Sequence, residues 1–225
     1  MCGRFFIAPE NEELLFRMLE EASRRQTAIL GESTVATGEV FPAAMTAALA
    51  AGRSGNIGAF PMEWGFHRAD SKGLIINVRS ETAMDKPAFR TSMLERRCVI
   101  PCSWYFEWER TTDSENTPEQ ISSMYIPEGR KPEKKKAGGT RKTKYAIRPK
   151  GTGLMYLAAI YRYEENRKLP VYAVLTREAA SGISFIHPRM PVIFTEKNYM
   201  AWLDKTQYPE AALRFCEKDM QYRKE

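Results

Sequence analysis

The second residue of the chain is a cysteine, in the opening stretch MCGRF. Removal of Met1 would give Cys2 two nucleophiles, a free α-amine and a thiol. Their ordinary pKa values, about 7.7–8.0 and about 8.5, leave both groups partly reactive near neutral pH. An N-terminal residue whose own amine takes part in catalysis is one way to activate a nucleophile. Taken alone, MCGRF is better explained as a small residue at an ordinary chain end.

Five more polar residues lie inside or beside apolar, strand-like stretches, where burial is costly. A carboxylate among aromatic side chains loses hydration, so its pKa should rise, which suits a general acid or base. A histidine beside an apolar run is as often a satisfied core group as a reacting one. Because the stretches are separate in the sequence, their polar groups can converge on one pocket. The five are Asn77, Arg79, Glu107, His187 and Arg189.

The motifs of several enzyme classes are missing from the sequence. Cys98 and Cys102 are four residues apart, but the chain has only two histidines and no second pair at zinc spacing. If 97–102 is a strand, these cysteines share one face and are core residues. The glycine-rich phosphate loops and the GxSxG elbow are also missing. We therefore expect no metal and no cofactor, and neither a serine hydrolase nor a nucleotide-driven enzyme.

The composition is that of a globular protein. The 225 residues fit one domain, and 43% apolar with 11% aromatic residues suffice for a sizeable core. No apolar run is long enough for a signal peptide or a membrane span. The four cysteines then indicate free thiols in a reducing compartment. We expect a cytoplasmic monomer with no membrane segment.

Positive charge is concentrated in one part of the sequence. Residues 128–150 contain ten Lys or Arg and two Glu, a net charge of +8, so the rest of the chain, at +6 overall, carries −2. Such a stretch is typical of a site for nucleic acid or another polyanion. A solvated loop without a partner has the same composition, and the sequence leaves both open.

The pattern of elements predicts an α+β fold. Many strands with helices at the ends indicate one domain over 1–225, with a largely antiparallel sheet curled into a barrel-like core and flanking helices. A polar stretch over about 111–144 predicts a long basic surface loop. We expect helices over 10–25, 196–205 and 209–222, and strands over 74–80, 97–102, 104–109, 145–149, 154–163, 171–176 and 190–194.

Seven short stretches together resemble the SRAP family, the SOS response-associated peptidases, also called abasic site processing proteins. Each stretch alone is a weak signal, but their order along the chain is specific. They are MCGRF, EVFPAA at 39–44, EWGF at 63–66, NVRSETAMDKPAFR at 77–90, RRCVIPCSWYFEWE at 96–109, LPVYAVLTREA at 169–179 and HPRMPVIF at 187–194.

The resemblance implies a covalent reaction with abasic sites in single-stranded DNA. The sugar of such a site opens to an aldehyde, which the Cys2 amine would attack to form a Schiff base. The Cys2 thiol would then close a five-membered thiazolidine ring, a step favoured because it is intramolecular. The crosslink would shield the damaged site from strand cleavage. The family name also implies removal of Met1, by the protein itself.

The resemblance assigns roles residue by residue. Cys2 would be the nucleophile, Asn77 would orient its terminus, Glu107 would shuttle protons during imine formation, and His187 would assist opening of the sugar ring. Guanidinium groups match phosphate geometry and a tryptophan ring can stack on a base. The implied DNA contacts are Arg4, Arg79 and Arg189 for phosphates and Trp64 for a base, although a core position for Trp64 is equally open.

Three departures from the family pattern concern DNA contact rather than the reacting groups. Trp104 stands where glycine is common, Pro188 stands where aspartate is common, and EVFPAA lacks an asparagine before its proline. Two other functions remain open. Cys2 could serve an N-terminal-nucleophile peptidase or amidase, or the basic loop could make the chain a noncovalent nucleic-acid-binding module. The expected partner is single-stranded DNA with abasic sites, with no membrane and no metal.

Overall fold

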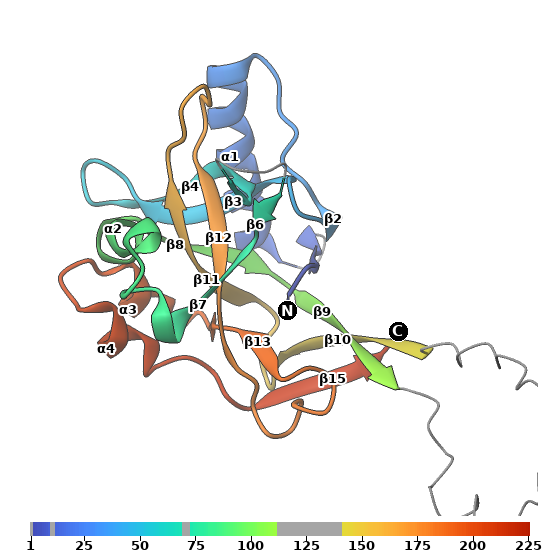
Figure 1. Ribbon diagram of the computed structural model, residues 1–225. Helices are drawn as coiled ribbons and strands as arrows, with labels where there is room; N and C mark the ends of the chain where they lie inside the picture. Colours follow the sequence, from blue (N-terminus) through green and yellow to red (C-terminus); the bar gives the residue numbers. More distant parts are fainter. Residues whose placement is uncertain (1, 10–11, 69–72, 112–140) are drawn as a thin grey trace, which may run out of the picture.

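The computed structural model describes residues 2–9, 12–68, 73–111 and 141–225 (Figure 1). Most of the loop predicted over 111–144 lies outside these residues. The described chain forms two larger β-sheets, a small two-stranded sheet and several helices. The two strands of the small sheet are β5 (Phe66–His67) and β6 (Leu74–Ile75).

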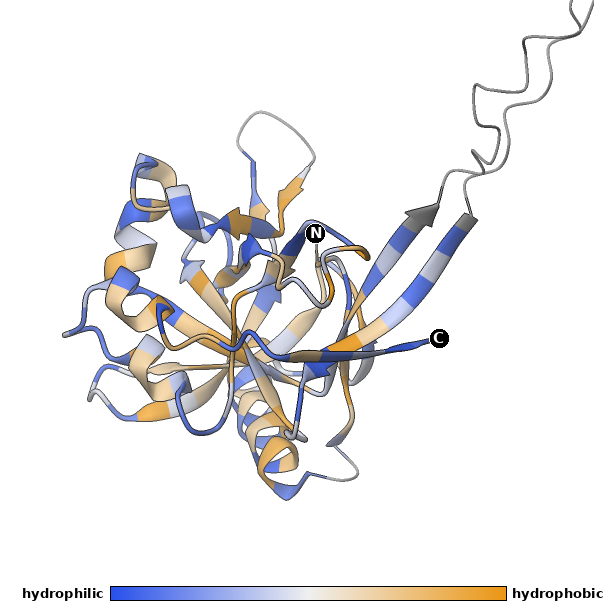
Figure 2. Cartoon of the chain, turned by 90° about the horizontal axis from the view of Figure 1, so that it is seen from below, coloured by the Kyte–Doolittle hydropathy of each residue, from blue (hydrophilic) through white to orange (hydrophobic). Residues whose placement is uncertain are grey.

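The first sheet has five antiparallel strands and holds the N-terminal residues. Its order is β15 (Met220–Lys224), β10 (Arg141–Pro149), β9 (Trp104–Thr111), β1 (Phe5–Ile7) and β2 (Gly38–Val40). Because β1 pairs with both β9 and β2, the residues that precede it are carried along the edge of β9. Figure 2 shows polar residues predominating where the β9–β10 pair leaves the body of the molecule.

The second sheet contains a ring of strands. Its path is β13 (Arg189–Pro191), β12 (Val171–Glu178), β4 (Ile57–Trp64), β3 (Met45–Ala51), β8 (Arg97–Cys102), β11 (Met155–Arg162) and β14 (Ile193–Phe194). A further β12–β11 pairing connects β12, β4, β3, β8 and β11 in a ring, and β7 (Asn77–Arg79) pairs with β12. The prediction of an α+β fold with a curled sheet is confirmed. Most pairings are antiparallel, but β12 runs parallel to β4 and β7.

The ring encloses the core, and β8, β11 and most of β12 are buried on both faces. All six residues of β8 are buried, including the cation of Arg97. Its guanidinium donates to the carbonyl oxygens of Asp204 and Gln207, at 3.0 and 2.9 Å, and lies 5.2 Å from the Trp202 ring centroid. These contacts replace part of the water that Arg97 loses on burial, while its buried Nε and Nη1 have no hydrogen-bond partner in the described chain. Cys98 and Cys102 are fully buried core residues, as predicted.

The helices cover the ring. The helix α1 (Glu13–Leu30) packs on β3 and β4 through a buried stripe that includes Leu15, Met18 and Ala22. It starts three residues later and ends five residues later than predicted. The residue after the helix is Gly31, whose φ of 87° is readily adopted by glycine. The others are η2 (Ser80–Thr82), α2 (Pro87–Glu95), α3 (Tyr199–Leu203) and α4 (Pro209–Leu213). No helix in the described ranges has the length and apolar character needed to cross a bilayer.

The prediction of a helix up to residue 222 is wrong. Helix α4 ends at Leu213, and β15 pairs with β10 instead. Strand β10 also begins at Arg141, four residues before the predicted start. Strands β2, β3 and β4 were not predicted, because the alanine-rich β3 sequence MTAALAA favours helix in isolation and Pro61 interrupts β4. In each case long-range pairing overrides local propensity.

Candidate active site

Cys2 lies beside β9, directly before β1. The backbone N–H of Phe106 donates to the carbonyl oxygen of Arg4 at 2.9 Å, which continues the β1–β9 contact toward the N-terminus. The Cys2 side chain is fully buried, and its thiol contacts the carbonyl oxygen of Arg4 at 3.6 Å. The residue is therefore held by its neighbours in the sheet and is not a loose chain end.

Asn77 holds the backbone of Cys2. Its side-chain nitrogen Nδ2 donates to the carbonyl oxygen of Cys2 at 2.8 Å. Asn77 is positioned by β7, where it pairs with Val174 of β12. Its other amide atom, Oδ1, is buried and accepts no hydrogen bond from any described residue. A buried acceptor without a donor costs about 1–3 kcal/mol, which makes this oxygen available to a new donor nearby.

Glu107 approaches the Cys2 thiol from β9. Side chains alternate along a strand, so Tyr105 and Glu107 point to one side of β9 while Trp104, Phe106 and Trp108 point to the other. Glu107 is only 5% exposed. Burial, and then the negative charge of Glu107, raise the pKa of the Cys2 thiol well above its ordinary value. At neutral pH this thiol keeps its proton.

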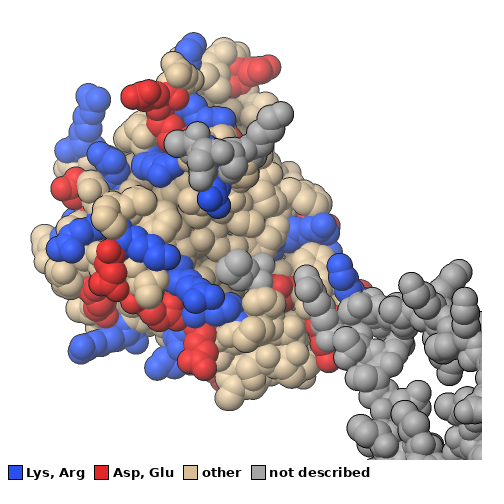
Figure 3. Space-filling model, in the orientation of Figure 1, with Lys and Arg blue, Asp and Glu red and all other residues tan. Residues whose placement is uncertain are grey.

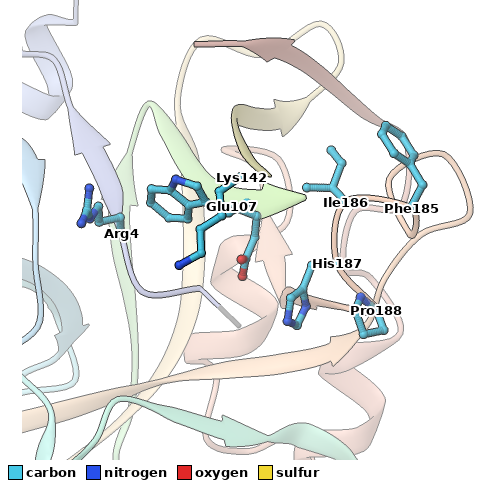
Figure 4. Close-up of a pocket in the computed structure, with 8 residues that line it drawn as sticks. Arg4, Glu107, Lys142, Phe185, Ile186, His187 and Pro188 are labelled. Carbon is cyan, nitrogen blue, oxygen red and sulfur yellow. The ribbon is translucent and has the colours of Figure 1, made fainter. Parts of the chain in front are cut away.

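A cavity of about 780 Å³ opens beside these residues (Figure 4). In Figure 4 the carboxylate of Glu107 and the ring of His187 point into the same space. Cys2 has no exposed surface, so it contributes none to the cavity wall. The residues that line the cavity are Arg4, Glu107, Trp108, Lys142, Phe185, Ile186, His187 and Pro188.

His187 is oriented by the backbone of the strand that follows it. Its Nδ1 lies 2.9 Å from the backbone nitrogen of Arg189 and 3.0 Å from the carbonyl oxygen of the same residue. When the Arg189 N–H donates to Nδ1, the proton of the neutral ring lies on Nε2. The structure therefore places three of the predicted groups near Cys2 or beside one another. Asn77 donates a hydrogen bond to Cys2, and the charge of Glu107 raises the pKa of the Cys2 thiol. His187 lines the same cavity as Glu107.

Of the three predicted phosphate contacts, Arg4 alone is among the described residues that line the cavity. Arg4 lines the cavity, donates to Glu39 at 3.1 Å and lies 4.9 Å from the Trp108 ring centroid. Arg189 forms two hydrogen bonds with the carboxylate of Glu81, at 2.7 and 2.9 Å. The Glu81 partner already occupies most of the guanidinium of Arg189. Arg79 is exposed at the end of β7.

The prediction that Trp64 offers a face for a base is wrong, because the ring is fully buried. It lies 4.9 Å from the Phe5 ring and stacks on Tyr172 at 6.3 Å, centroid to centroid. Its indole N–H donates to the carbonyl oxygen of Ile76 at 3.1 Å. No side of the ring is available to DNA, so Trp64 is a core residue.

Five cavity residues were given no role from the sequence. Trp108 follows Glu107 directly, so its proximity was readable from the motif. Lys142 lies in the basic stretch, and Phe185, Ile186 and Pro188 are close to His187 in the sequence. Neither a basic stretch nor a local neighbour signals which cavity a side chain lines, and only the folded chain shows it.

The surface combines both charges. On the face shown in Figure 3, Lys and Arg side chains border an uncharged central region, with acidic side chains among them. The described residues contain no group of three or more His, Cys, Asp or Glu side chains arranged to hold a metal ion.

Comparison with known proteins gives relatives along much of the chain. The "Abasic site processing protein YoaM" of Bacillus subtilis is 27% identical over 133 residues, which are 58% of this chain and 47% of that protein. The "Abasic site processing protein HMCES" of Rattus norvegicus is 29% identical over 163 residues, 64% of this chain and 44% of that protein. In each case the match spans about half the length of the relative.

Solved structures share the fold. A protein from Bacteroides thetaiotaomicron superposes with a TM-score of 0.71 at 15% identity, covering 99% of this chain and 91% of that one. A phage-related protein from Bordetella bronchiseptica superposes with a TM-score of 0.65 at 16% identity, covering all of this chain and 94% of that one. The sequence model described as "SOS response associated peptidase (SRAP)" matches residues 1–224, so the chain belongs to the SRAP family.

Proposed function

We propose that this chain processes abasic sites in single-stranded DNA by forming a covalent bond through Cys2. The observation that carries the proposal is the hydrogen bond from Asn77 to the Cys2 carbonyl, which holds the terminus beside Glu107 at the edge of the cavity. The names of the relatives, which describe abasic site processing, support the choice of substrate.

The proposed reaction starts after Met1 is removed. The free α-amine of Cys2 adds to the aldehyde carbon of the opened sugar, and loss of one water gives an imine. The thiol sulfur then adds to the imine carbon, and the thiol proton passes to the nitrogen. The product is a thiazolidine ring, and the only molecule released is water. Since both nucleophiles belong to one residue, the second step needs no further encounter.

Glu107 and His187 would move the protons. Imine formation requires a proton on the departing hydroxyl. Glu107 lies close enough to Cys2 for its negative charge to raise the pKa of the Cys2 thiol. His187, on the same cavity, would transfer a proton when the sugar ring opens. The buried thiol stays protonated at neutral pH and so brings its own proton to ring closure. In this scheme the amine reacts first and the thiol second.

Removal of Met1 is part of the proposal, and we assign it to the protein itself. Asn77 and Glu107 are both neighbours of Cys2, whose nitrogen forms that bond. Until that bond is cut, Cys2 has an amide nitrogen in place of an amine and cannot form an imine. The peptidase step would therefore switch on the DNA reaction.

One denaturing gel tests the proposal. The protein is mixed with single-stranded DNA that carries one abasic site, and the product is run in SDS. We expect a shifted band that is lost in Cys2→Ala and in protein with a blocked Met1. Cys216→Ala is the matched control. It also removes a cysteine thiol, but Cys216, which is 9% exposed, has no part in the proposed chemistry.

The other outcomes identify other functions. Peptide hydrolysis without a shifted band would indicate an N-terminal-nucleophile peptidase or amidase and contradict the proposal. Retardation on a native gel that is lost at high salt, with no band in SDS, would indicate a noncovalent nucleic-acid-binding module. Intact-protein mass spectrometry of the same samples shows whether Met1 has been removed.

A further inference from the structure

The five-stranded sheet has a second face that the proposed chemistry does not use. Trp104, Phe106 and Trp108 point away from Glu107 on β9. Across the strand pair, Ala146 lies opposite Phe106 and Lys144 lies opposite Trp108. We call this surface the outer aromatic face and define it by Trp104, Phe106, Trp108, Lys144, Arg148 and Arg223.

Cations lie directly on the rings of this face. The guanidinium groups of Arg148 and Arg223 are 4.0 and 4.5 Å from the Trp104 ring centroid. The ammonium group of Lys144 is 3.8 Å from the ring centroid of Phe106. Such cation–π contacts stabilise a cation on an aromatic surface and keep it there. Alternating rings and positive charges therefore follow β9 along its length.

The charges near Trp104 are not balanced. Arg223 donates to Glu225 at 2.8 Å, but the guanidinium of Arg148 has no ion pair or hydrogen bond within the described chain. Burial and the positive charge of Arg223 both lower the pKa of Arg148. Only one of these two adjacent guanidinium groups has a carboxylate partner among the described residues, so the ion cluster is incomplete. A phosphate would complete it, because guanidinium and phosphate match in charge and geometry.

The opposite end of the face is balanced and adjoins the cavity. Glu39 accepts hydrogen bonds from both Arg4 and Lys144, at 3.1 and 3.0 Å. Trp108 lines the cavity as well as belonging to the outer aromatic face. The two surfaces are thus continuous through Trp108. Trp104 and Trp108 are four positions apart on β9, which corresponds to about 13 Å along the strand. A stacked DNA single strand, with 3.4 Å between nucleotides, covers this distance with about four nucleotides.

The described helices leave this face open. Helix α1 packs on β3 and β4, and α3 packs on β8, both in the other sheet. Figure 1 shows α2, α3 and α4 on the side of the molecule away from β9, β10 and β15. The Arg223 side chain is 61% exposed and Trp104 and Trp108 are half-buried, whereas Phe106 is buried beneath Lys144. A ligand therefore has access to the unbalanced end of the face.

We propose that the outer aromatic face binds the part of a DNA single strand that flanks the abasic site, with Arg148 and Arg223 on Trp104 holding a phosphate. The choice of ligand rests on the proposed function. Aromatic rings that stack bases, placed beside cations that bind phosphates, are how proteins hold single strands without regard to sequence. An acidic peptide would use the cations but would have no use for the rings.

Binding of an intact single-stranded 20-mer tests this face without any crosslinking. We compare Arg148→Gln/Arg223→Gln with Arg24→Gln/Arg53→Gln, which removes two exposed cations from α1 and from the β3–β4 turn. Fluorescence anisotropy across a salt series should show Kd rising about tenfold for the first variant only. Its log Kd–log salt slope should be smaller by about 0.7, the contribution of one single-strand phosphate, because the two arginines hold a single phosphate. Trp104→Leu should weaken binding by about tenfold. Equal affinities in the two double variants would overturn the proposal.

Two further measurements separate the possible failures. A two-nucleotide abasic strand spans about 7 Å at 3.4 Å per nucleotide, which is less than the distance from the cavity to Trp104. Its crosslinking rate should therefore be the same in Arg148→Gln/Arg223→Gln as in the unmodified protein. If that strand forms no crosslink at all, the proposed function fails while the 20-mer data still decide this inference. Phenylglyoxal labelling of the unmodified protein needs no variant, and DNA should protect Arg148. Unchanged labelling, or tighter binding of polyglutamate than of the 20-mer, would overturn the inference.

Discussion

The side-chain nitrogen of Asn77 lies 2.8 Å from the carbonyl oxygen of Cys2 and donates a hydrogen bond to it. The two residues are 75 positions apart in the sequence. This bond fixes the backbone of the proposed nucleophile from β7, while the thiol is packed against the backbone of Arg4. The terminus is thereby held in one geometry before any substrate arrives.

Asn77→Ala should slow crosslinking by about 10- to 100-fold, because a nucleophile displaced by about 1 Å loses rate on that scale. The stability change should be small, since the substitution also removes the buried Oδ1 that lacks a donor in the described chain. Single-turnover crosslinking and thermal unfolding check this. A large loss of stability with an unchanged rate would show that Asn77 serves the fold and not the reaction.

Glu107→Gln should reduce the crosslinking rate by about 10²- to 10⁴-fold, the usual contribution of a general acid or base. Glutamine keeps the shape of the side chain but cannot exchange a proton, so the affinity for an abasic strand should change much less. Rates at saturating DNA and anisotropy titrations measure the two effects separately. Equal losses in rate and affinity would remove the proton-transfer role.

The Cys2 thiol should make the folded state less stable at alkaline pH. Its pKa is raised in the folded state by burial and by Glu107, so its contribution to stability is complete below the ordinary thiol pKa of about 8.5. As pH rises above that value, the unfolded chain loses the thiol proton and the folded chain does not. The free energy of unfolding should then fall by about 1.4 kcal/mol per pH unit for this thiol.

Denaturant titrations from pH 7 to 10 measure this slope. Cys2→Ala should make it shallower than in the unmodified protein. Cys98 and Cys102 are also fully buried with raised pKa values, so part of the slope should remain. An identical slope in Cys2→Ala would show that Cys2 does not contribute.

Trp64→Ala should destabilise the fold by about 3–5 kcal/mol, the usual effect of removing a large aromatic side chain from a core. Trp64→Phe keeps an aromatic ring against Phe5 and Tyr172 and should retain DNA affinity. Denaturant titration and anisotropy test the pair. A stable Trp64→Phe protein with greatly weakened DNA binding would indicate that Trp64 contacts DNA and would contradict its assignment as a core residue.

The sequence predicted the strands that carry a strong local signal. The mostly apolar 97–102 and 171–176 form β8 and most of β12, and 104–109 forms most of β9. The sequence-based prediction failed where the secondary structure of a segment depends on the strand with which it pairs. Residues 220–222 belong to the predicted helix over 209–222 but pair with β10, and β3 is rich in alanine, a residue that favours helix. Local propensity amounts to less than 1 kcal/mol per residue for ordinary residues, so a sheet edge or a buried position outweighs it.

The sequence by itself determined which residue types could react, and in what order they occur: an N-terminal cysteine, a carboxylate among aromatic residues and a histidine beside an apolar run. Only the tertiary structure decided that Asn77 reaches Cys2, that Glu107 and His187 share a cavity, and that Trp64 is enclosed by protein. The physical reason is that chemical type is a property of each residue, whereas distance and burial depend on strand pairings between residues far apart in the chain. The balance of charges on the outer aromatic face depends in the same way on the pairing of β10 with β9 and β15.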